Sequence, residues 1–215
     1  MIQQEINDLK SKAQQGDAKA QVRLGVYYLY GDGIKKNIKS AVKWLKCAVA
    51  QGAVDAHYFL GSCYEFGYGV EQNLMEAVRL YKSAAEQGDA NAQCGLALCY
   101  ETGKGVVENI TEAVTLYKRA AQQGQYWAQM KLGLCYWNGQ GVNKNRTEAA
   151  KWFRLAAEHG YDKAQRCLAY CYANGVGVKK NVKEAIKWLR FAAEQGDKRA
   201  KAQLQILLEN ETENQ

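Results

Sequence analysis

The residues of this sequence that are best suited to catalysis or metal binding are its seven cysteines and two histidines. Thiolates and imidazoles serve proteins as nucleophiles, general bases and zinc ligands. Cys167 and Cys171 are one helical turn apart and would share a helix face. This pair lacks the further ligands that a zinc site requires. We therefore expect no metal site and no cofactor.

Four cysteines occupy one repeated position, and their spacing argues against disulfides: Cys63, Cys99, Cys135 and Cys171. Equivalent helices of stacked repeats lie about 10 Å apart. A disulfide needs Cα atoms within about 7 Å of each other. We expect buried free thiols in a reducing cytosol.

The two histidines do not form a recognisable catalytic motif. His57 is expected on a helix surface, because the same repeat position is polar elsewhere: Gln93, Gln129 and Gln165. His159 precedes Gly160, where the partial negative charge of a helix C-terminus favours it. No phosphate-binding loop, HExxH motif or nucleophile elbow occurs. We expect no catalytic residue, although a triad built from distant positions is recognised only by its geometry.

One pattern recurs through the chain at a fixed step of 36 residues. Its first copy reads Leu24-Gly25-x-x-Tyr28-x-x-Gly31-x-Gly33. The leucine returns at Leu60, Leu96, Leu132 and Leu168. A further glycine closes each copy: Gly52, Gly88, Gly124, Gly160 and Gly196. A constant step indicates a repeat protein, in which each repeat is one supersecondary unit.

Each repeat is predicted to form two helices. In the first repeat, one helix spans about 18–30, because Ala20, Leu24 and Tyr28 lie four residues apart and stack on one face. The second helix begins after a recurring Asn, a strong N-cap: Asn37, Asn73, Asn109, Asn145 and Asn181. In four repeats a Glu follows three residues later, which resembles the reciprocal capping box.

Large side chains recur in the middle of the second helix: Trp44-Leu45, Leu80-Tyr81, Leu116-Tyr117, Trp152-Phe153 and Trp188-Leu189. Recurring alanines flank them and allow close helix packing. We interpret these large residues as core rather than as a ligand site, because their periodicity explains them.

The pattern predicts an all-α fold in one continuous domain. It comprises a half-repeat helix at 1–16, repeats at 17–52, 53–88, 89–124, 125–160 and 161–196, and a half-repeat helix at 197–208. Half-repeats cover the exposed ends of such arrays. The polar residues 209–215 are expected to form a disordered tail.

The motif Ala-x-x-x-Leu-Gly-x-x-Tyr-x-x-Gly-x-Gly-Val, followed by Ala-x-x-Trp/Tyr and Ala-Ala-x-x-Gly, resembles the Sel-one-like repeat (SLR) family, a relative of the tetratricopeptide repeat. The resemblance covers residues 1–208. It implies a right-handed α/α superhelix (a solenoid), with first helices on the concave side, and an adaptor or scaffold role. Small bacterial members include immunity proteins, and some cysteine-rich relatives bind or hydrolyse β-lactams. The cysteine pairs of those relatives are absent here, since the matching positions include Ala85 and Gln93.

By this similarity, the variable positions of the first helices face a concave groove. These positions are rich in Tyr, Trp, Met and Arg, the composition of a binding hot spot. The alternative is that the aromatic rings pack against the next repeat. The candidate partner-binding residues are Tyr30, Tyr58, Glu65, Phe66, Glu101, Trp127, Met130, Trp137, Arg166 and Tyr170.

Trp127 and Trp137 are the strongest candidates, since they lie roughly 15 Å apart on one helix and would bracket a groove. Met130 between them offers an adaptable surface. Acidic and basic positions predict charged contacts with the partner: Glu65 and Glu101 with a basic group, and Arg166 with an acidic one.

The formal net charge is +7, and the basic residues recur on the second helices near Glu residues. This distribution predicts a solvated ridge paired in part by i,i+3 contacts, and no nucleic-acid site. No stretch approaches the length of a membrane span. The first residues lack a leader pattern, so we expect a cytoplasmic protein. We also expect it to be a monomer. A chain from which a leader had been removed would instead be secreted or periplasmic.

The sequence therefore predicts a non-catalytic protein–protein interaction scaffold or adaptor that binds a protein or peptide in its concave groove. A narrower alternative is an immunity-type inhibitor of one toxic effector. A β-lactam-binding or hydrolysing enzyme is the third hypothesis.

Overall fold

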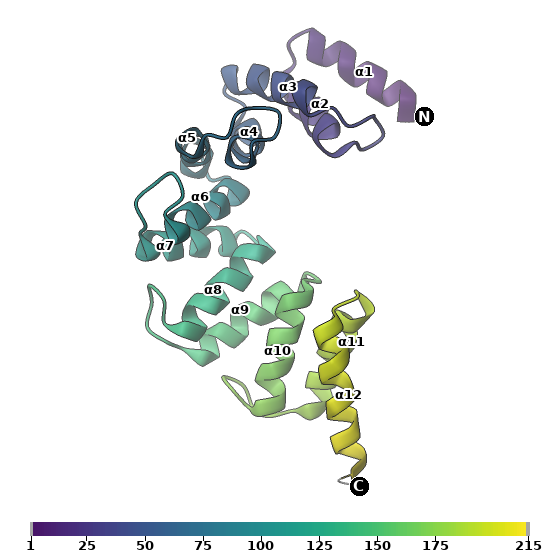
Figure 1. The fold of residues 1–215 in the computed structure, drawn as a ribbon, viewed down its shortest axis with the longest axis vertical. Helices are drawn as coiled ribbons and strands as arrows, with labels where there is room; N and C mark the ends of the chain where they lie inside the picture. Colours follow the sequence, from purple (N-terminus) through teal and green to yellow (C-terminus); the bar gives the residue numbers. More distant parts are fainter. Residues whose placement is uncertain (1, 214–215) are drawn as a thin grey trace. The chain divides into compact units, whose positions relative to one another are not determined.

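The computed structural model describes residues 2–213, which form helices joined by short loops and contain no strand (Figure 1). These described residues form twelve helices: α1 (Ile2–Gln14), α2 (Ala18–Tyr30), α3 (Ile38–Ala50), α4 (Val54–Phe66), α5 (Leu74–Glu86), α6 (Ala90–Thr102), α7 (Ile110–Gln122), α8 (Tyr126–Asn138), α9 (Arg146–Glu158), α10 (Asp162–Asn174), α11 (Val182–Glu194) and α12 (Lys198–Glu213). The even-numbered helices are the first helices of the repeats. The second helices are α3, α5, α7, α9 and α11.

The chain divides into two compact units, Met1–Asn109 and Ile110–Gln215, which we name the N-terminal unit and the C-terminal unit. Within each unit, every helix packs against the next one along the chain, as α2 does on α3 and α8 on α9. First helices of the N-terminal unit also contact one another, α2 with α4 and α4 with α6.

The second helices begin at the predicted Asn caps. The Asn73 side-chain oxygen accepts a hydrogen bond of 3.0 Å from the Glu76 N–H, and three other second helices repeat this contact. The backbone N–H of Asn73 donates to the carbonyl of Tyr64 at 3.0 Å. Glu76 pairs with Arg79 at 2.7 Å. The expected reciprocal capping box is therefore wrong, because the cap N–H is already bound to the first helix.

Two recurring glycines occupy places where no side chain fits. A Cβ atom on Gly133 of α8 would lie 2.6 Å from the ring of Phe153, so the first helix rests directly on the second. Gly177 has φ +73°, and a Cβ atom there would collide with the carbonyl of Arg146. Gly133 thus allows α8 to contact α9 closely, and Gly177 allows its loop to approach the start of α9.

At least one large residue of each predicted pair in the second helices is buried in the core, whereas Trp44, Trp152 and Trp188 are only half-buried. The side chains of Tyr81, Tyr117 and Phe153 are fully buried, as are those of Leu45 and Leu80. Alanines on either side of these residues are buried too, which lets neighbouring helices approach closely.

Buried glutamines connect each first helix to the second helix before it. The Gln21 amide donates to the carbonyl of Ala13 at 3.1 Å. The same bond recurs at Gln93, Gln129 and Gln165. His57 takes this position in the second repeat, where it is 8% exposed and its Nδ1 lies 2.9 Å from the Ala53 carbonyl. The expectation of a surface histidine is wrong, because the repeat position is internal.

The C-terminal helix is longer than the repeat predicts. α12 continues to Glu213, so residues 209–213 are helical rather than disordered, and the remainder of the expected tail lies outside the described residues. Across the described residues 2–213, no helix is both long and apolar enough to cross a membrane.

Candidate partner-binding surface

First helices of the N-terminal unit line an open cavity of about 380 Å³. Its walls include the candidate Tyr58 and four further residues at variable positions of the first helices: Val22, Val26, Asp55 and Asn91. The rings of Tyr58 and Phe59 meet edge to face at 5.2 Å. Burial raises the pKa of Tyr58 to about 12, so its hydroxyl stays protonated at neutral pH. The cavity therefore combines aromatic walls with polar groups.

Glu65 does not reach this surface. Its side chain is 6% exposed, and its carboxylate accepts a hydrogen bond of 2.8 Å from the Tyr81 hydroxyl. Burial raises the pKa of Tyr81, and the adjacent Glu65 charge raises it further, so Tyr81 remains a donor. The expectation that Glu65 meets a basic group on a partner is wrong, because its bond is made inside the protein.

The remaining candidates of this unit lie outside the cavity lining. Tyr30 and Phe66 are 65% and 53% exposed at the last residues of α2 and α4. The ring of Phe66 stacks on that of Tyr68 at 5.5 Å. Glu101 is partly buried in the last turn of α6. Their role in binding stays a prediction.

Two cavities of about 310 and 160 Å³ open between α8, α10 and α12 of the C-terminal unit, and we name them the C-terminal cavities. They share Tyr170 and Gln203 as walls. The candidates Trp137, Arg166 and Tyr170 all line them. The sequence did not predict the α12 contribution, which consists of Gln203, Ile206 and Leu207.

Trp137 forms an ordered aromatic wall. Its ring meets those of Tyr170 at 5.8 Å and Phe153 at 6.0 Å. The Arg146 guanidinium lies over the Trp137 ring, 3.7 Å from its centroid, in a cation–π contact. Sequence reasoning missed Arg146, although a signal was present, because the other second helices begin with an aliphatic residue: Ile38, Leu74, Ile110 and Val182.

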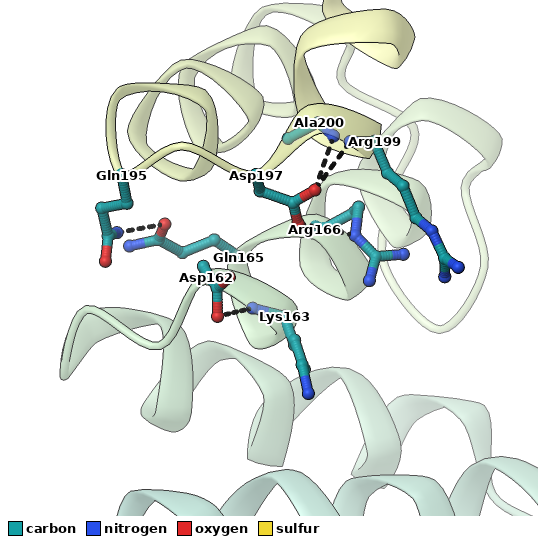
Figure 2. Close-up of polar contacts among 8 residues, drawn as sticks. All are labelled: Asp162, Lys163, Gln165, Arg166, Gln195, Asp197, Arg199 and Ala200. Atoms are coloured by element: carbon teal, nitrogen blue, oxygen red, sulfur yellow. Dashed lines mark hydrogen bonds and ion pairs between the residues drawn. The ribbon is translucent and has the colours of Figure 1, made fainter.

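Arg166 is a fixed cation at the edge of the larger cavity. Its Nε atom pairs with the Asp197 carboxylate at 2.9 Å, and its terminal nitrogens point away from Asp197 (Figure 2). Asp197 also caps α12 by accepting from the Ala200 N–H at 3.1 Å. Burial would raise the pKa of Asp197, but the bonds from Ala200 and Arg166 outweigh it and hold this pKa below its usual value. Arg166 is therefore positioned by an intramolecular acid.

The two other candidates of this unit do not line the C-terminal cavities. Met130 is 7% exposed and belongs to the core, so the expectation that it offers an adaptable surface is wrong. The Trp127 ring is half-buried, meets the Tyr117 ring edge to face at 6.0 Å and lies under the Lys131 ammonium at 5.3 Å. Trp127 and Trp137 thus have different surroundings.

The cysteines are free, and the four at the repeated position are buried. Burial raises the pKa of Cys63 to about 11 and that of Cys171 to about 12. The prediction of buried free thiols is confirmed for this set. No three His, Cys, Asp or Glu side chains within residues 2–213 are placed to hold a metal ion.

The basic residues of the second helices are partly paired, as predicted. Glu76, Glu148 and Glu184 each lie within 4 Å of the basic residue three positions later. The Lys46 ammonium lies over the Tyr64 ring at 5.7 Å, and Arg154 donates to the Tyr172 hydroxyl. These residues therefore contribute to contacts between successive repeats.

Helix pairs that repeat along the chain and pack in series define an all-α repeat protein of the solenoid class. The chain belongs to the Sel1 repeat family, whose model matches residues 18–52, 54–89, 90–125, 128–161 and 162–197. The resemblance predicted from the sequence is thus confirmed. Sel1 repeat proteins are generally non-enzymatic scaffolds for protein–protein interaction.

Solved structures agree with this assignment. A protective antigen with an SLR fold, present in uropathogenic Escherichia coli strains, is 37% identical over 93% of this chain, with a TM-score of 0.83. A Sel1 repeat protein from Oxalobacter formigenes is 32% identical over 94%, with a TM-score of 0.88. This chain covers 43% and 58% of those two chains, about half their length.

An immunity protein from Pseudomonas aeruginosa shares the fold at 21% identity, with a TM-score of 0.58, over 85% of this chain and 67% of its own. No curated protein is significantly similar to this chain.

Proposed function

We propose that this protein is a non-catalytic scaffold that binds a protein or peptide partner through its first helices. The observation that carries this proposal is the pair of C-terminal cavities, which are open and lined by Trp137, Tyr170 and Arg166. Aromatic and arginine side chains around an apolar pocket are the usual composition of an interaction hot spot. Membership of the Sel1 repeat family supports the same role.

The two rings of this surface suit binding in different ways. Tyr170 is 49% exposed and offers apolar area that a partner would cover. Trp137 is already held by Arg146, Phe153 and Tyr170. An ordered ring loses little conformational entropy on binding, which favours affinity.

The immunity-type alternative is supported only by fold. The solved immunity proteins are 21 to 24% identical to this chain, a level that carries no argument about a toxic target. The β-lactam alternative has no observation in its favour, and it predicts turnover of a chromogenic β-lactam by the pure protein.

Partner capture with matched surface variants tests the proposal. Tyr170→Ser changes the first-helix surface, and Phe191→Ser removes a ring of similar exposure, 42%, from the second helix α11. We expect a lysate protein that wild type and Phe191→Ser retain and Tyr170→Ser loses. Equal thermal unfolding of the variants would show that the fold is intact. Retention by Tyr170→Ser together with loss by Phe191→Ser would contradict the proposal.

A further inference from the structure

We infer that the C-terminal cavities select a partner segment in which a carboxylate neighbours a large apolar side chain. This inference rests on the proposed function and adds the chemistry of the partner. It follows from the cavity walls, the charge at their edge and the order of the aromatic side chains.

The walls of both cavities are mainly apolar. Besides Trp137 and Tyr170, they consist largely of Leu134, Phe153, Cys167, Ala169, Ala173, Leu189, Ile206 and Leu207. Ile206 is 57% exposed, so apolar area on α12 remains in contact with solvent. Covering such walls with an aliphatic or aromatic side chain is favourable, because apolar area leaves water.

The charge of the lining has one sign. No acidic residue lines either cavity, and Arg166 is the charged residue in their walls. Asp197 binds its Nε atom, and the terminal nitrogens of Arg166 point away from Asp197 (Figure 2). A guanidinium edge suits a carboxylate, which accepts two parallel N–H bonds.

Residues near Arg166 add further positive charge. Lys163 lies three positions earlier on α10, on the same helix face, and is exposed. Arg199 is also exposed, and its backbone N–H donates to Asp197 at 2.8 Å. Asp162 and Asp197 are the acids of this region, and both accept backbone hydrogen bonds at helix starts. The three cations therefore outnumber the two acids.

The 380 Å³ cavity of the N-terminal unit, between α2, α4 and α6, shows that a basic lining is not general to the repeat. Two carboxylates, Asp55 and Asp89, line it together with one cation, Arg23. The lining of this cavity thus has a net negative charge, whereas the lining of the C-terminal cavities has a net positive charge. A preference for acidic segments is expected of the C-terminal cavities alone.

A phage-displayed library of random dodecapeptides, selected on immobilised full-length protein, tests the inference. We expect enriched sequences to carry Asp or Glu within two positions of Phe, Trp, Leu, Ile or Met. Arg166→Gln should remove the acidic preference and keep the apolar one. Arg166→Lys, which keeps the charge but loses the two parallel N–H groups, should weaken the preference without abolishing it, and Arg190→Gln, which removes an exposed arginine from α11, should leave it unchanged. Thermal unfolding of each variant confirms its fold.

The leading peptide and its Asp→Asn form give a quantitative readout. On wild type, the acidic peptide should bind about fivefold tighter or more, with an advantage that shrinks as salt increases. On Arg166→Gln the two peptides should bind equally. Enriched sequences without an acidic excess, the same acidic excess on Arg166→Gln, or no enriched peptide would each overturn the inference. A partner lost by Tyr170→Ser but bound through a non-acidic segment would overturn it and leave the proposed function intact.

Discussion

The hydroxyl group of Tyr81 donates a hydrogen bond of 2.8 Å to the carboxylate of Glu65, and both side chains are buried. In the first repeat the equivalent residues are Leu45 and Leu29, which are buried as well. A polar pair in one repeat thus fills the space that an apolar pair fills in another. Each member of the polar pair depends on the other for its hydrogen bond.

Tyr81→Phe is expected to lower the free energy of unfolding by about 1–3 kcal/mol, because Glu65 loses its buried donor. The double change Glu65→Leu with Tyr81→Leu copies the first repeat and should restore stability to within about 1 kcal/mol of wild type. Urea unfolding of Tyr81→Phe, of the single variants Glu65→Leu and Tyr81→Leu, and of the double variant measures both effects. Additive losses in the double variant would contradict the coupling.

The buried thiols predict a loss of stability at alkaline pH. Burial raises the pKa of Cys63 from 9.0 to about 11 and that of Cys171 to about 12. Between pH 9 and 11 the unfolded chain therefore holds fewer protons than the folded protein, and stability falls as pH rises. We expect each thiol to lower the free energy of unfolding by about 1 kcal/mol between about pH 8 and 10.

Burial also raises the pKa of tyrosines, so tyrosines lower stability at alkaline pH as the cysteines do. The cysteine contribution therefore needs its own control. Burial raises the pKa of Tyr58 from 10.0 to about 12, which affects stability mainly above pH 10. Between about pH 8 and 10, the double variant Cys63→Ala with Cys171→Ala should lose less free energy of unfolding than wild type does. Urea unfolding at each of the two pH values measures this loss. An identical loss would show that these thiols do not carry the effect.

The repeat step allowed the helices, caps and core to be predicted, because each recurring residue meets the same surroundings in every repeat. Leu45, Tyr81 and Phe153 occupy the same repeat position in different repeats, and all three are buried. The candidate site was less predictable, because it is built from variable positions. Whether such a position is open depends on its neighbour from another helix. Glu65 is buried because a tyrosine faces it.

The closing half-repeat also contributes to the candidate site. Gln203 and Ile206 line the smaller C-terminal cavity from α12, and their contribution was missed because the binding positions were expected on the first helices of the complete repeats. Met130 looked like a flexible surface residue, yet it fills the core of its unit. Arg146 was the exception, since a charged residue at an otherwise aliphatic position indicates a special contact.

Gln129, one of the buried glutamines of the first helices, lacks a hydrogen bond that Gln21 and Gln165 have. The Gln51 amide donates to Gln21 at 2.7 Å, and the Gln195 amide donates to Gln165 at 2.9 Å. The Gln129 side-chain oxygen is buried without a hydrogen-bond partner. His159 stands at the position equivalent to the donating glutamine. The difference between repeats thus lies in one side chain.

His159→Gln is expected to raise the free energy of unfolding by about 0.5–1.5 kcal/mol, because its amide would donate to Gln129 as in the other repeats. Urea unfolding at neutral pH measures the gain. His159→Ala removes the imidazole without supplying a donor and should give no gain. A gain of the same size in His159→Ala would assign the effect to loss of the histidine.

Arg146→Leu would give the fourth repeat the aliphatic residue that Leu74 provides in the second. The change removes a cation–π contact worth about 1–2 kcal/mol. It also removes a buried Nη1 atom without a hydrogen-bond partner, whose burial costs about 1–3 kcal/mol. Stability should therefore stay within about 1 kcal/mol of wild type, while the Trp137 indole N–H signal shifts and broadens in the NMR spectrum. An unchanged signal, assigned through Trp137→Phe, would show that Arg146 does not order this ring.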